Sequence, residues 1–202
     1  VNSRYTELEL QEMKFNNTAI LPLIINFEIY TRYNKDILLR YDDDFVNILF
    51  TGRIMPQKRQ DDLIKIFYYY QKINPKSRLI LVGSADNFER YCSSLQDLIK
   101  RLQINNVIFT GSVSLEDLVA YYKVADVFLC MCEWETFCVP LVESMYFSIP
   151  IIANNATAIP QTLGDSGILV NKKDYCTIAE MINEIIENKK LRDQIIKKEQ
   201  IR

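Results

Sequence analysis

Short apolar runs alternate with amphipathic stretches from Val46 to the end of the chain, and this alternation limits the possible folds more than any other feature. In the amphipathic stretches, apolar residues recur three and four positions apart, which is typical of a helix with one buried face. Continuously apolar strands separated by such helices predict a parallel sheet covered on both faces. We therefore expect an α/β fold with a doubly wound, Rossmann-like sheet. The expected strands are Val46–Phe50, Leu79–Val82, Val107–Phe109, Val127–Cys130, Pro150–Ala153 and Gly167–Val170.

Polar residues mark the expected helix starts. Ser114 and Asp117 resemble a capping box, in which each side chain receives the other residue's backbone N–H. Asp174 is in the position of a cap for a terminal helix that carries Ile178, Met181, Ile182 and Ile185.

Before residue 46 the pattern is weaker. We expect a helix within Val1–Phe15, a strand over Ala19–Ile25 and a connecting arm over Tyr30–Phe45. Pro22 lies inside the expected strand and places it at a sheet edge, because proline cannot donate to a central ladder. The predicted organisation is a crossing segment and arm over residues 1–45, followed by one domain over residues 46–202.

The composition is that of an ordinary globular protein. Apolar residues make up 49% of the chain and charged residues 25%, and no apolar run approaches the roughly 20 residues of a membrane span. Lys and Arg number 24 against 26 Asp and Glu, so the net charge of −2 gives no global field for nucleic acid. We expect no nucleic-acid partner.

Five cysteines occur without paired spacing, which favours reduced thiols in a cytoplasmic protein. Cys130, Cys132 and Cys138 could be imagined as three zinc ligands, but the chain has no histidine and no fourth cysteine nearby. Small buried side chains are favoured over a metal site. Without histidine, acid–base chemistry must come from carboxylates, from the substrate or from a partner domain.

The segment CMCEWETFCVPLVE, residues 130–143, joins a buried strand to a helix. Pro140 suits the first helical turn, where its missing N–H is no loss. This places Glu135 on the loop and Glu143 one turn into the helix. Three backbone N–H groups should then lie free around one spot, those of Phe137, Cys138 and Val139.

Free amides at a helix start attract a phosphate or a hydroxyl oxygen, and two carboxylates beside them can hold sugar hydroxyls. The alternative is structural. Glu135 would then be a solvated loop acid, and Glu143 a helix-start acid that favours the helix dipole.

Three of the five glycines, Gly52, Gly83 and Gly111, follow expected strands. In open parallel sheets, ligands bind at the carboxyl ends of the strands, although each glycine could also serve a tight turn. Arg53 and Lys58 lie on the loop behind Gly52 and could clamp a diphosphate, or could be solvated charges. The cations could bind phosphates and the acids could bind hydroxyl groups. A ligand that carries both is a nucleotide sugar.

These residues stand in strings that resemble the carboxyl-terminal half of glycosyltransferase family 4, retaining enzymes of the GT-B architecture. The resemblance covers residues 46 to 172 and extends to NSRYTELELQEM and ILPLIINFE, which look like the segment where such enzymes leave their first domain. The strings are FTGRIMPQK, LILVGS, NVIFTGSVSLEDLVAYYKVADVFL, CEWETFCVPLVESM and AIPQTLGDSGILV.

The resemblance implies a role for each matching residue. Arg53 and Lys58 would bind the donor's diphosphate, Glu143 the ribose hydroxyls, and Glu135 the hydroxyls of the transferred sugar. The amides of residues 137–139 would lie beside the sugar and phosphate. Main-chain groups near Ile108 would meet the base, with Gly83 and Gly111 giving clearance.

The resemblance also implies an activity: transfer of a sugar, with retention and without a cofactor, from a UDP- or GDP-linked donor. The cations and the helix start would stabilise the leaving diphosphate, whose oxygen helps to deprotonate the acceptor. A glycan or glycolipid acceptor would bind an amino-terminal domain absent from this chain, in the cytoplasm or at the inner face of the membrane. We therefore expect this chain alone to bind nucleotide sugar weakly and to transfer nothing.

Two alternatives remain open. The chain could be a non-catalytic nucleotide-sugar-binding module or subunit. It could also belong to another GT-B enzyme such as a sugar-nucleotide epimerase, against which the absent histidine and the spacing of Glu135 and Glu143 argue.

The chain departs from the family's pattern at several positions. Thr136 and Cys138 stand where the family usually has glycine on either side of the phenylalanine, and a Cβ at each place should narrow the approach of a ligand to the backbone. Arg59 and Ser148 also replace common glycines. Cys132 replaces a common serine, and Gln161 a common glutamate.

Overall fold

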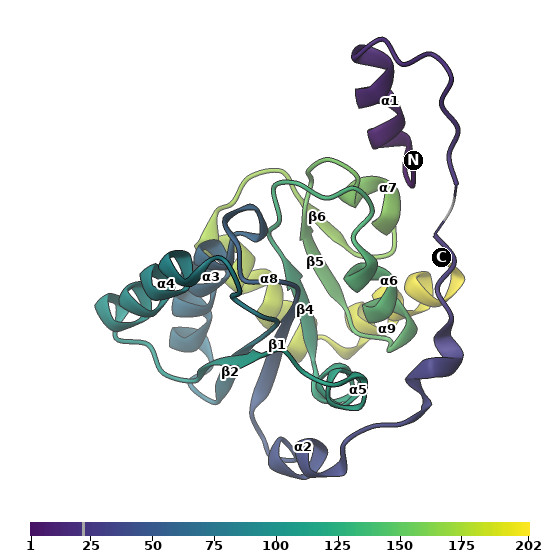
Figure 1. The fold of residues 1–202 in the computed structure, drawn as a ribbon. Helices are drawn as coiled ribbons and strands as arrows, with labels where there is room; N and C mark the ends of the chain where they lie inside the picture. Colours follow the sequence, from purple (N-terminus) through teal and green to yellow (C-terminus); the bar gives the residue numbers. More distant parts are fainter. Residues whose placement is uncertain (22) are drawn as a thin grey trace.

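A single parallel sheet forms the centre of the protein. The computed structural model describes residues 1–21 and 23–202. Within these residues six strands lie in the order β3-β2-β1-β4-β5-β6, and every neighbouring pair is parallel (Figure 1). The predicted doubly wound α/β fold is confirmed. The strands are β1 Val46–Thr51, β2 Ser77–Val82, β3 Val107–Gly111, β4 Val127–Cys130, β5 Ile151–Asn154 and β6 Ile168–Val170.

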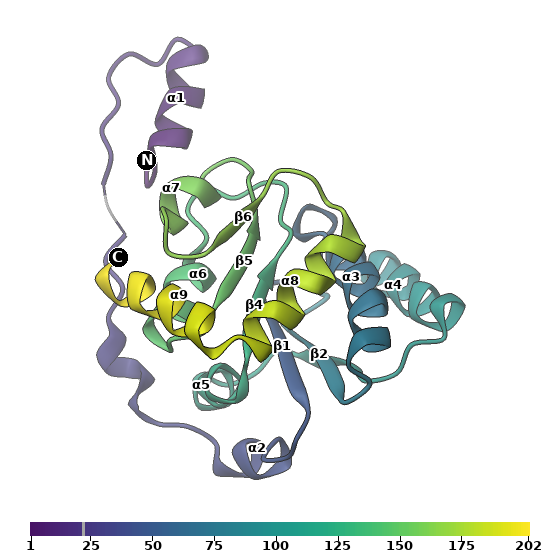
Figure 2. The same cartoon turned by 180° about the vertical axis from the view of Figure 1, so that it is seen from behind.

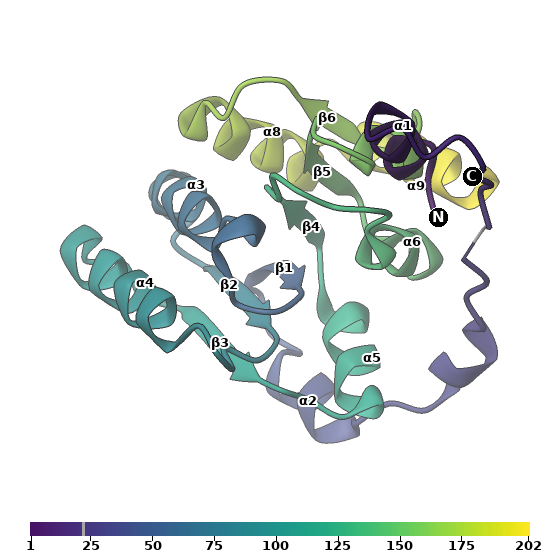
Figure 3. The same cartoon turned by 45° about the horizontal axis from the view of Figure 1, so that its top comes forward.

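Helices cover both faces of this sheet. Helices α3, α4 and α8 lie on one face, and α5 and α6 on the other (Figure 3). Helix α9 follows α8 and crosses toward α6 (Figure 2). Since both faces are covered, strands β1, β2, β4 and β5 are almost wholly buried, which is why they are continuously apolar. The helices are α3 Gln60–Ile73, α4 Glu89–Leu102, α5 Leu115–Val124, α6 Val139–Tyr146, α7 Ile159–Leu163, α8 Tyr175–Glu187 and α9 Lys189–Ile201.

The strand order reverses direction between β1 and its neighbour β4. From β1 the chain moves outward through β2 to β3, then crosses back through α5 to β4 on the other side of β1. The loops after β1 and β4 therefore leave the sheet at the same edge and in opposite directions. That divergence is where open parallel sheets form ligand crevices.

The expected caps are present in a modified form. The Ser114 side chain accepts the Asp117 N–H at 3.1 Å, and Asp174 accepts the Thr177 N–H at 3.1 Å. The Asp117 carboxylate does not return to Ser114 but accepts a hydrogen bond from Asn34 Nδ2 at 2.7 Å. Only one of the two hydrogen bonds of the capping box is therefore formed. The Asp117 side chain instead connects α5 to the amino-terminal segment through Asn34.

The amino-terminal segment carries three short helices, α1 Arg4–Glu12, the 3₁₀ helix η1 Phe27–Thr31 and α2 Lys35–Arg40. Helix α1 lies beyond the sheet next to α7 (Figure 1), and its Arg4 N–H donates to Gln161 Oε1 of α7 at 2.9 Å. Helix α2 packs on α5, with Ile37 and Tyr41 buried in the main core. The second half of the expected arm is therefore packed against the domain.

The expected strand over Ala19–Ile25 is wrong for the residues that the structure describes. Pro22 lies outside the described residues, and the rest of the segment is irregular. Leu21 is 77% exposed and Ile24 95% exposed, because among the described residues no strand lies beside this segment to pair with it. An apolar, β-branched composition alone does not make a strand without a neighbour.

Helices α7 and α9 were not predicted from the sequence, and neither were the short helices η1 and α2 of the amino-terminal segment. Helix α7 has only 5 residues, too few to show a period, and α9 is rich in charged residues, so its apolar stripe is weak. Across the described residues, no helix combines the length and the apolarity that a membrane crossing requires.

Helix α9 buries an acid against the sheet. Glu199 is 3% exposed, and neither of its carboxylate oxygens has a hydrogen-bond partner among the described residues. Burial raises the pKa of Glu199 to about 8, although the Ile151 amide offsets part of the rise. The folded protein therefore favours the protonated acid.

We expect Glu199 to make the protein less stable as the pH rises. Between pH 4.5, the carboxyl's ordinary pKa, and about 8, the unfolded chain releases this proton while the folded chain retains it. The free energy of unfolding should then fall with pH, by a few kcal/mol, on the order of what such a pKa difference implies. Urea unfolding between pH 4.5 and 8 measures the decline.

Glu199→Gln should remove most of that decline, because the amide stays neutral throughout. Glu187→Gln changes an exposed acid on the neighbouring α8 and should keep the wild-type pH dependence. A wild-type decline that persists unchanged in Glu199→Gln would contradict the assignment.

Candidate functional site

A cleft of about 510 Å³ opens at the carboxyl ends of β1 and β2. Arg53, on the loop after β1, and Glu143, on α6, both line it. Gly52 and Gly83 form part of its wall, and Ser112 and Val113 bring the loop after β3 to the opposite side. The structure thus brings together a cation and an acid that lie 90 positions apart in sequence.

Arg53 is available to a ligand. Its side chain is exposed, and its guanidinium makes no hydrogen bond or ion pair within the described part of the chain. Its backbone is fixed: the Arg53 carbonyl accepts a hydrogen bond from Gln60 Nε2 at 2.9 Å, and the next N–H, of Ile54, donates to the Ser84 carbonyl at 2.8 Å. Because its backbone is fixed and its guanidinium is unpaired within the described residues, Arg53 is suited to bind a phosphate.

Lys58 and Glu135 form an ion pair at the same edge of the sheet. Lys58 Nζ lies 2.5 Å from Glu135 Oε1, and both side chains are largely buried. Burial lowers the pKa of Lys58, but the neighbouring Cys132 and Glu135 outweigh it, so the pKa stands above its usual value. Neither residue is among those that line the cleft with Arg53 and Glu143. The structure therefore divides the four predicted residues between the lining of the cleft, which includes Arg53 and Glu143, and an ion pair outside that lining.

A buried acid anchors the loops that carry this ion pair. Asp62 is fully buried and its oxygens lie within 3.1 Å of Arg59, 3.4 Å of Lys65 and 2.9 Å of Lys173, while Tyr175 Oη donates to it at 2.8 Å. Burial alone would raise the pKa of Asp62, but the hydrogen bonds from Lys173 and Tyr175 hold it below its usual value.

Glu133 extends the Asp62 network to the loop after β4. Its carboxylate accepts from Arg59 at 2.9 Å and from Lys173 at 3.0 Å, and its N–H donates to the Gln57 carbonyl at 2.9 Å. The loops after β1, β4 and β6 are thereby locked to one another next to Lys58.

The three expected amides start α6. Within the described residues, the N–H groups of Phe137, Cys138 and Val139 donate to no protein acceptor. The Phe137 carbonyl accepts a hydrogen bond from the Thr162 hydroxyl, and the Glu135 N–H donates to Thr157 Oγ1 at 2.9 Å, so the loop is held on both sides of these amides.

Three of the four positions at which the chain replaces a common family glycine adopt a left-handed backbone. The φ angles are +54° at Arg59, +70° at Cys138 and +57° at Ser148. Thr136 is not among the residues with positive φ. A residue with a Cβ carries a strain of about 1–2 kcal/mol in this conformation. The backbone therefore keeps the form that glycine would favour, although the side chains have changed.

The glycines at the strand ends differ in how much space a side chain would have. A Cβ on Gly83 would lie 2.1 Å from the Gly52 carbonyl oxygen, so Gly83 makes room for the neighbouring strand end. A Cβ on Gly111 would meet no atom within 4 Å. Ile108 lies inside β3, paired with Ile80, and is not among the residues that line the cleft. The part of this loop that reaches the cleft is Ser112 and Val113.

Three thiols lie together behind the β4 loop. Cys130 Sγ and Cys132 Sγ are 3.4 Å apart, and Cys138 is buried beside them. The neighbouring thiols of Cys132 and Cys138 lower the pKa of the Cys130 thiol, although its burial acts in the opposite direction. Among the described residues, no group of three His, Cys, Asp or Glu side chains is arranged to hold a metal ion.

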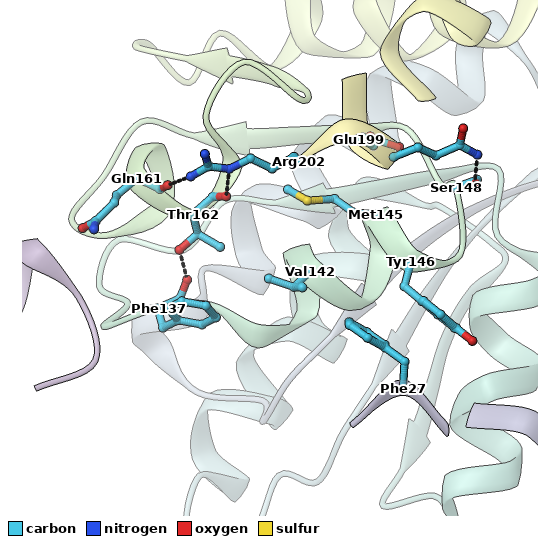
Figure 4. Close-up of a pocket in the computed structure, with 11 residues that line it drawn as sticks. Phe27, Phe137, Val142, Met145, Tyr146, Ser148, Gln161, Thr162, Glu199 and Arg202 are labelled. Carbon is cyan, nitrogen blue, oxygen red and sulfur yellow. Dashed lines mark hydrogen bonds between the residues drawn. The ribbon is translucent and has the colours of Figure 1, made fainter. Parts of the chain in front are cut away.

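A second hollow, of about 600 Å³, lies between α6, α7 and α9 (Figure 4). Its walls are largely apolar, and Arg202 closes one end with hydrogen bonds to the carbonyls of Gln161, at 2.7 Å, and Thr162, at 3.4 Å. Phe137 is the one predicted site residue that lines it. Since the predicted cations and acids lie elsewhere, this hollow is not the expected nucleotide site.

Two tyrosines that the sequence analysis did not assign contact the predicted acid. Tyr30 Oη donates to Glu143 Oε1 at 2.5 Å, and Tyr122 Oη donates to Glu143 Oε2 at 2.7 Å. Tyr122 lies on the buried side of α5, and Tyr30 lies in the expected arm. No local pattern links either residue to position 143.

The model of the family described as "Glycosyl transferases group 1" matches residues 34–202. A Klebsiella pneumoniae protein described as an uncharacterized 41.2 kDa protein in the cps region is 31% identical over 140 residues, which are 68% of this chain and 36% of that protein. The Staphylococcus aureus capsular polysaccharide biosynthesis glycosyltransferase CapM is 29% identical over 177 residues, 85% of this chain and 45% of that protein. The chain thus spans less than half the length of these relatives.

Two solved structures illustrate the likeness in fold. Anabaena HepE in complex with UDP-glucose superposes with a TM-score of 0.86 at 22% identity, covering 100% of this chain and 57% of that one. The carboxyl-terminal domain of the Francisella tularensis group 1 glycosyl transferase LpcC superposes with a TM-score of 0.71 at 21% identity, covering 87% of this chain and 94% of that one.

We expect the two strand-end glycines to respond very differently to alanine. Gly83→Ala should lower the free energy of unfolding by more than about 3 kcal/mol, because the methyl group overlaps a backbone carbonyl that cannot move freely. Gly111→Ala should cost only about 1–2 kcal/mol, the strain of a left-handed alanine with open space around it. Urea unfolding of both variants measures the difference, and equal losses would contradict this account.

Proposed function

Since this chain belongs to the glycosyl transferases group 1 family, we propose that it is the donor-binding part of a retaining glycosyltransferase. In this proposal a sugar passes from a nucleoside diphosphate to a glycan or lipid-linked acceptor, on the cytoplasmic side of the membrane. The domain over residues 46–202 binds the donor and residues 1–45 form the crossing segment. The acceptor is bound by an amino-terminal domain outside this chain, consistent with the greater length of the relatives.

The observation that carries the proposal is the pairing of Arg53 and Glu143 across one cleft at the point where the strand order reverses. A guanidinium can bind two phosphate oxygens in a fork, and a carboxylate accepts hydrogen bonds from vicinal hydroxyls. We therefore place the diphosphate at Arg53 and the ribose at Glu143. HepE has been solved with UDP-glucose, which supports a uridine nucleotide as the first donor to test.

Lys58 and Glu135 complete the proposed site beside this cleft. When the bond from the anomeric carbon to the diphosphate breaks, negative charge grows on the departing phosphate. Lys58, Arg53 and the amides of residues 137–139 supply positive charge and N–H donors for it, which is the electrostatic stabilisation that a chain without histidine can offer. Glu135 then accepts hydrogen bonds from the hydroxyls of the transferred sugar.

A non-catalytic nucleotide-sugar-binding module is the second candidate, and the loop around Phe137 is the observation that favours it. Thr136 and Cys138 carry a Cβ at positions where the family usually has glycine, next to the amides that start α6. Such a module would bind the nucleotide without moving the sugar. Transfer from labelled donor to a lipid-linked acceptor, measured with this chain joined to its amino-terminal domain, separates the two candidates.

We expect Arg53→Ala to weaken binding of UDP at least about tenfold, the effect of losing one charge-assisted contact to a phosphate. Uridine lacks phosphate, so its binding should not change. Because the Arg53 side chain is exposed and makes no hydrogen bond or ion pair within the described residues, folding should be unaffected. Isothermal titration calorimetry with UDP, GDP and uridine measures each affinity.

Arg90→Ala provides a matched control, since Arg90 is an exposed arginine on α4 that does not line the cleft. This variant should bind UDP as the wild type does. The proposed function would be overturned if the wild type bound neither UDP nor GDP, or if Arg53→Ala bound both as tightly as the wild type.

A further inference from the structure

The carboxylate of Glu143 is held by two phenol groups that come from segments far apart in sequence. Tyr30 Oη donates to Oε1 at 2.5 Å and Tyr122 Oη donates to Oε2 at 2.7 Å. The hydrogen on Tyr122 is used for Glu143, so the Thr51 hydroxyl, 2.7 Å away, must be the donor in the contact between Thr51 and Tyr122. A directed chain of hydrogen bonds therefore runs from the end of β1 to Glu143.

This arrangement leaves part of the carboxylate available. An ionised carboxylate has about four acceptor positions, and the two phenols use one on each oxygen. Glu143 is 7% exposed and still lines the cleft with Arg53. The acid can thus accept two further hydrogen bonds from a ligand in the cleft, one on each oxygen, without losing either tyrosine.

The position of the Tyr30 ring is set by packing. Phe27, on the same 3₁₀ turn, stacks on Tyr146 with ring centroids 4.4 Å apart, and the Tyr30 ring meets Phe147 edge-on at 5.9 Å. Farther along, the Asn34 N–H donates to the Glu116 carbonyl at 3.1 Å. The segment is held on both sides of Tyr30, so its hydroxyl can fix the side-chain torsions of Glu143.

The two hydrogen-bond donors to Glu143 are neutral phenols, which bring no positive charge to the site. Cations offset the negative charge of a buried carboxylate, whereas hydroxyl groups donate hydrogen bonds to its oxygens without offsetting that charge. Burial, and secondarily Glu143, raise the pKa of both Tyr30 and Tyr122 far above the ordinary range. Both phenols therefore stay protonated and remain donors.

We propose that Tyr30 and Tyr122 are positioning residues that orient Glu143 so that its two oxygens accept the 2′- and 3′-hydroxyl groups of the donor ribose. The inference rests on the proposed function, because it needs a nucleotide in this cleft. It adds that ribose recognition depends on the amino-terminal segment, through Tyr30. The orientation of the Glu143 carboxylate then allows the site to distinguish ribonucleotides from their deoxy analogues.

The test compares two ligands that differ only in the ribose hydroxyls. Calorimetry gives the affinities of UDP and of 2′,3′-dideoxyuridine diphosphate for the wild type, Tyr30→Phe and Tyr122→Phe. The wild type should bind UDP about tenfold or more tightly than the dideoxy ligand. Tyr30→Phe should weaken UDP binding about five- to tenfold and leave the dideoxy ligand unchanged, so that the preference nearly disappears. Tyr122→Phe should act in the same direction.

Tyr146→Phe is the matched control. Tyr146 belongs to the same aromatic group, is 47% exposed, and its hydroxyl makes no hydrogen bond within the described residues. Its loss should leave both affinities at the wild-type values. Thermal unfolding of each variant confirms that the fold is kept, and Tyr30→Phe removes a single oxygen, which preserves the ring packing.

The possible results are distinguishable. If Tyr30→Phe lowers the affinity for both ligands equally, the role of Tyr30 is structural and the inference is overturned. If the wild type binds UDP without preferring it to the dideoxy ligand, Glu143 does not read the ribose, and the inference fails while the proposed function survives. If the wild type binds neither ligand and also no GDP, the proposed function itself fails. A preference lost in Tyr30→Phe and kept in Tyr146→Phe supports the inference.

Discussion

The carboxyl edge of this sheet depends on how it stabilises buried carboxylates. Burying a charge is costly unless partners compensate for the lost water. Asp62 is compensated by three cations and one phenol, Glu135 by one cation, and Glu143 by two phenols. Around Asp62, the cations offset the negative charge of the acid and hold the neighbouring loops together. The last arrangement, around Glu143, brings no opposing charge to the acid, so a buried acid fastens loops together at one place and lines the cleft at the other.

The loops at this edge keep their backbone path although their glycines have been replaced. Arg59 and Cys138 both adopt positive φ where glycine would be unstrained. Arg59 recovers stability through ion pairs with Asp61, Asp62 and Glu133, and Cys138 through burial of its side chain among the other thiols. Each side chain thus does structural work that glycine could not. The consequence for a ligand falls on Cys138, because its Cβ stands at the start of α6.

The sequence predicted the parts of the structure that depend on local pattern. All six strands and the helices with a clear apolar period could be found, because each is a continuous segment buried on a known face. Helix α9 was missed because its many charged residues obscure the apolar stripe that contains Ile195. The strand expected over Ala19–Ile25 is wrong because, within the part of the chain that the structure describes, no partner strand lies beside it.

The same limit applies to the candidate site. Arg53 and Glu143 could be placed at one edge from the positions of their strands and helix, which follow from the parallel topology. The contact between Tyr30 and Glu143 spans 113 positions, and neither residue's neighbours signal it. The ion pair between Lys58 and Glu135 was not foreseen either, although opposite charges assigned to adjoining subsites should attract each other when no ligand separates them.

The amino-terminal segment reaches the site at several separate points, and this sets how the site can respond to motion. Asn2 donates to Thr136 Oγ1 at 3.3 Å, the Arg4 N–H donates to Gln161 Oε1 at 2.9 Å, and Tyr30 donates to Glu143. The first two contacts flank the loop whose amides start α6, and the third holds the acid on that helix. A displacement of this segment would therefore change the amide cluster and the carboxylate together. Because two of these contacts are single hydrogen bonds at exposed or partly buried positions, each is weak. The buried bond from Tyr30 is the contact through which such a displacement would be felt most strongly in the cleft.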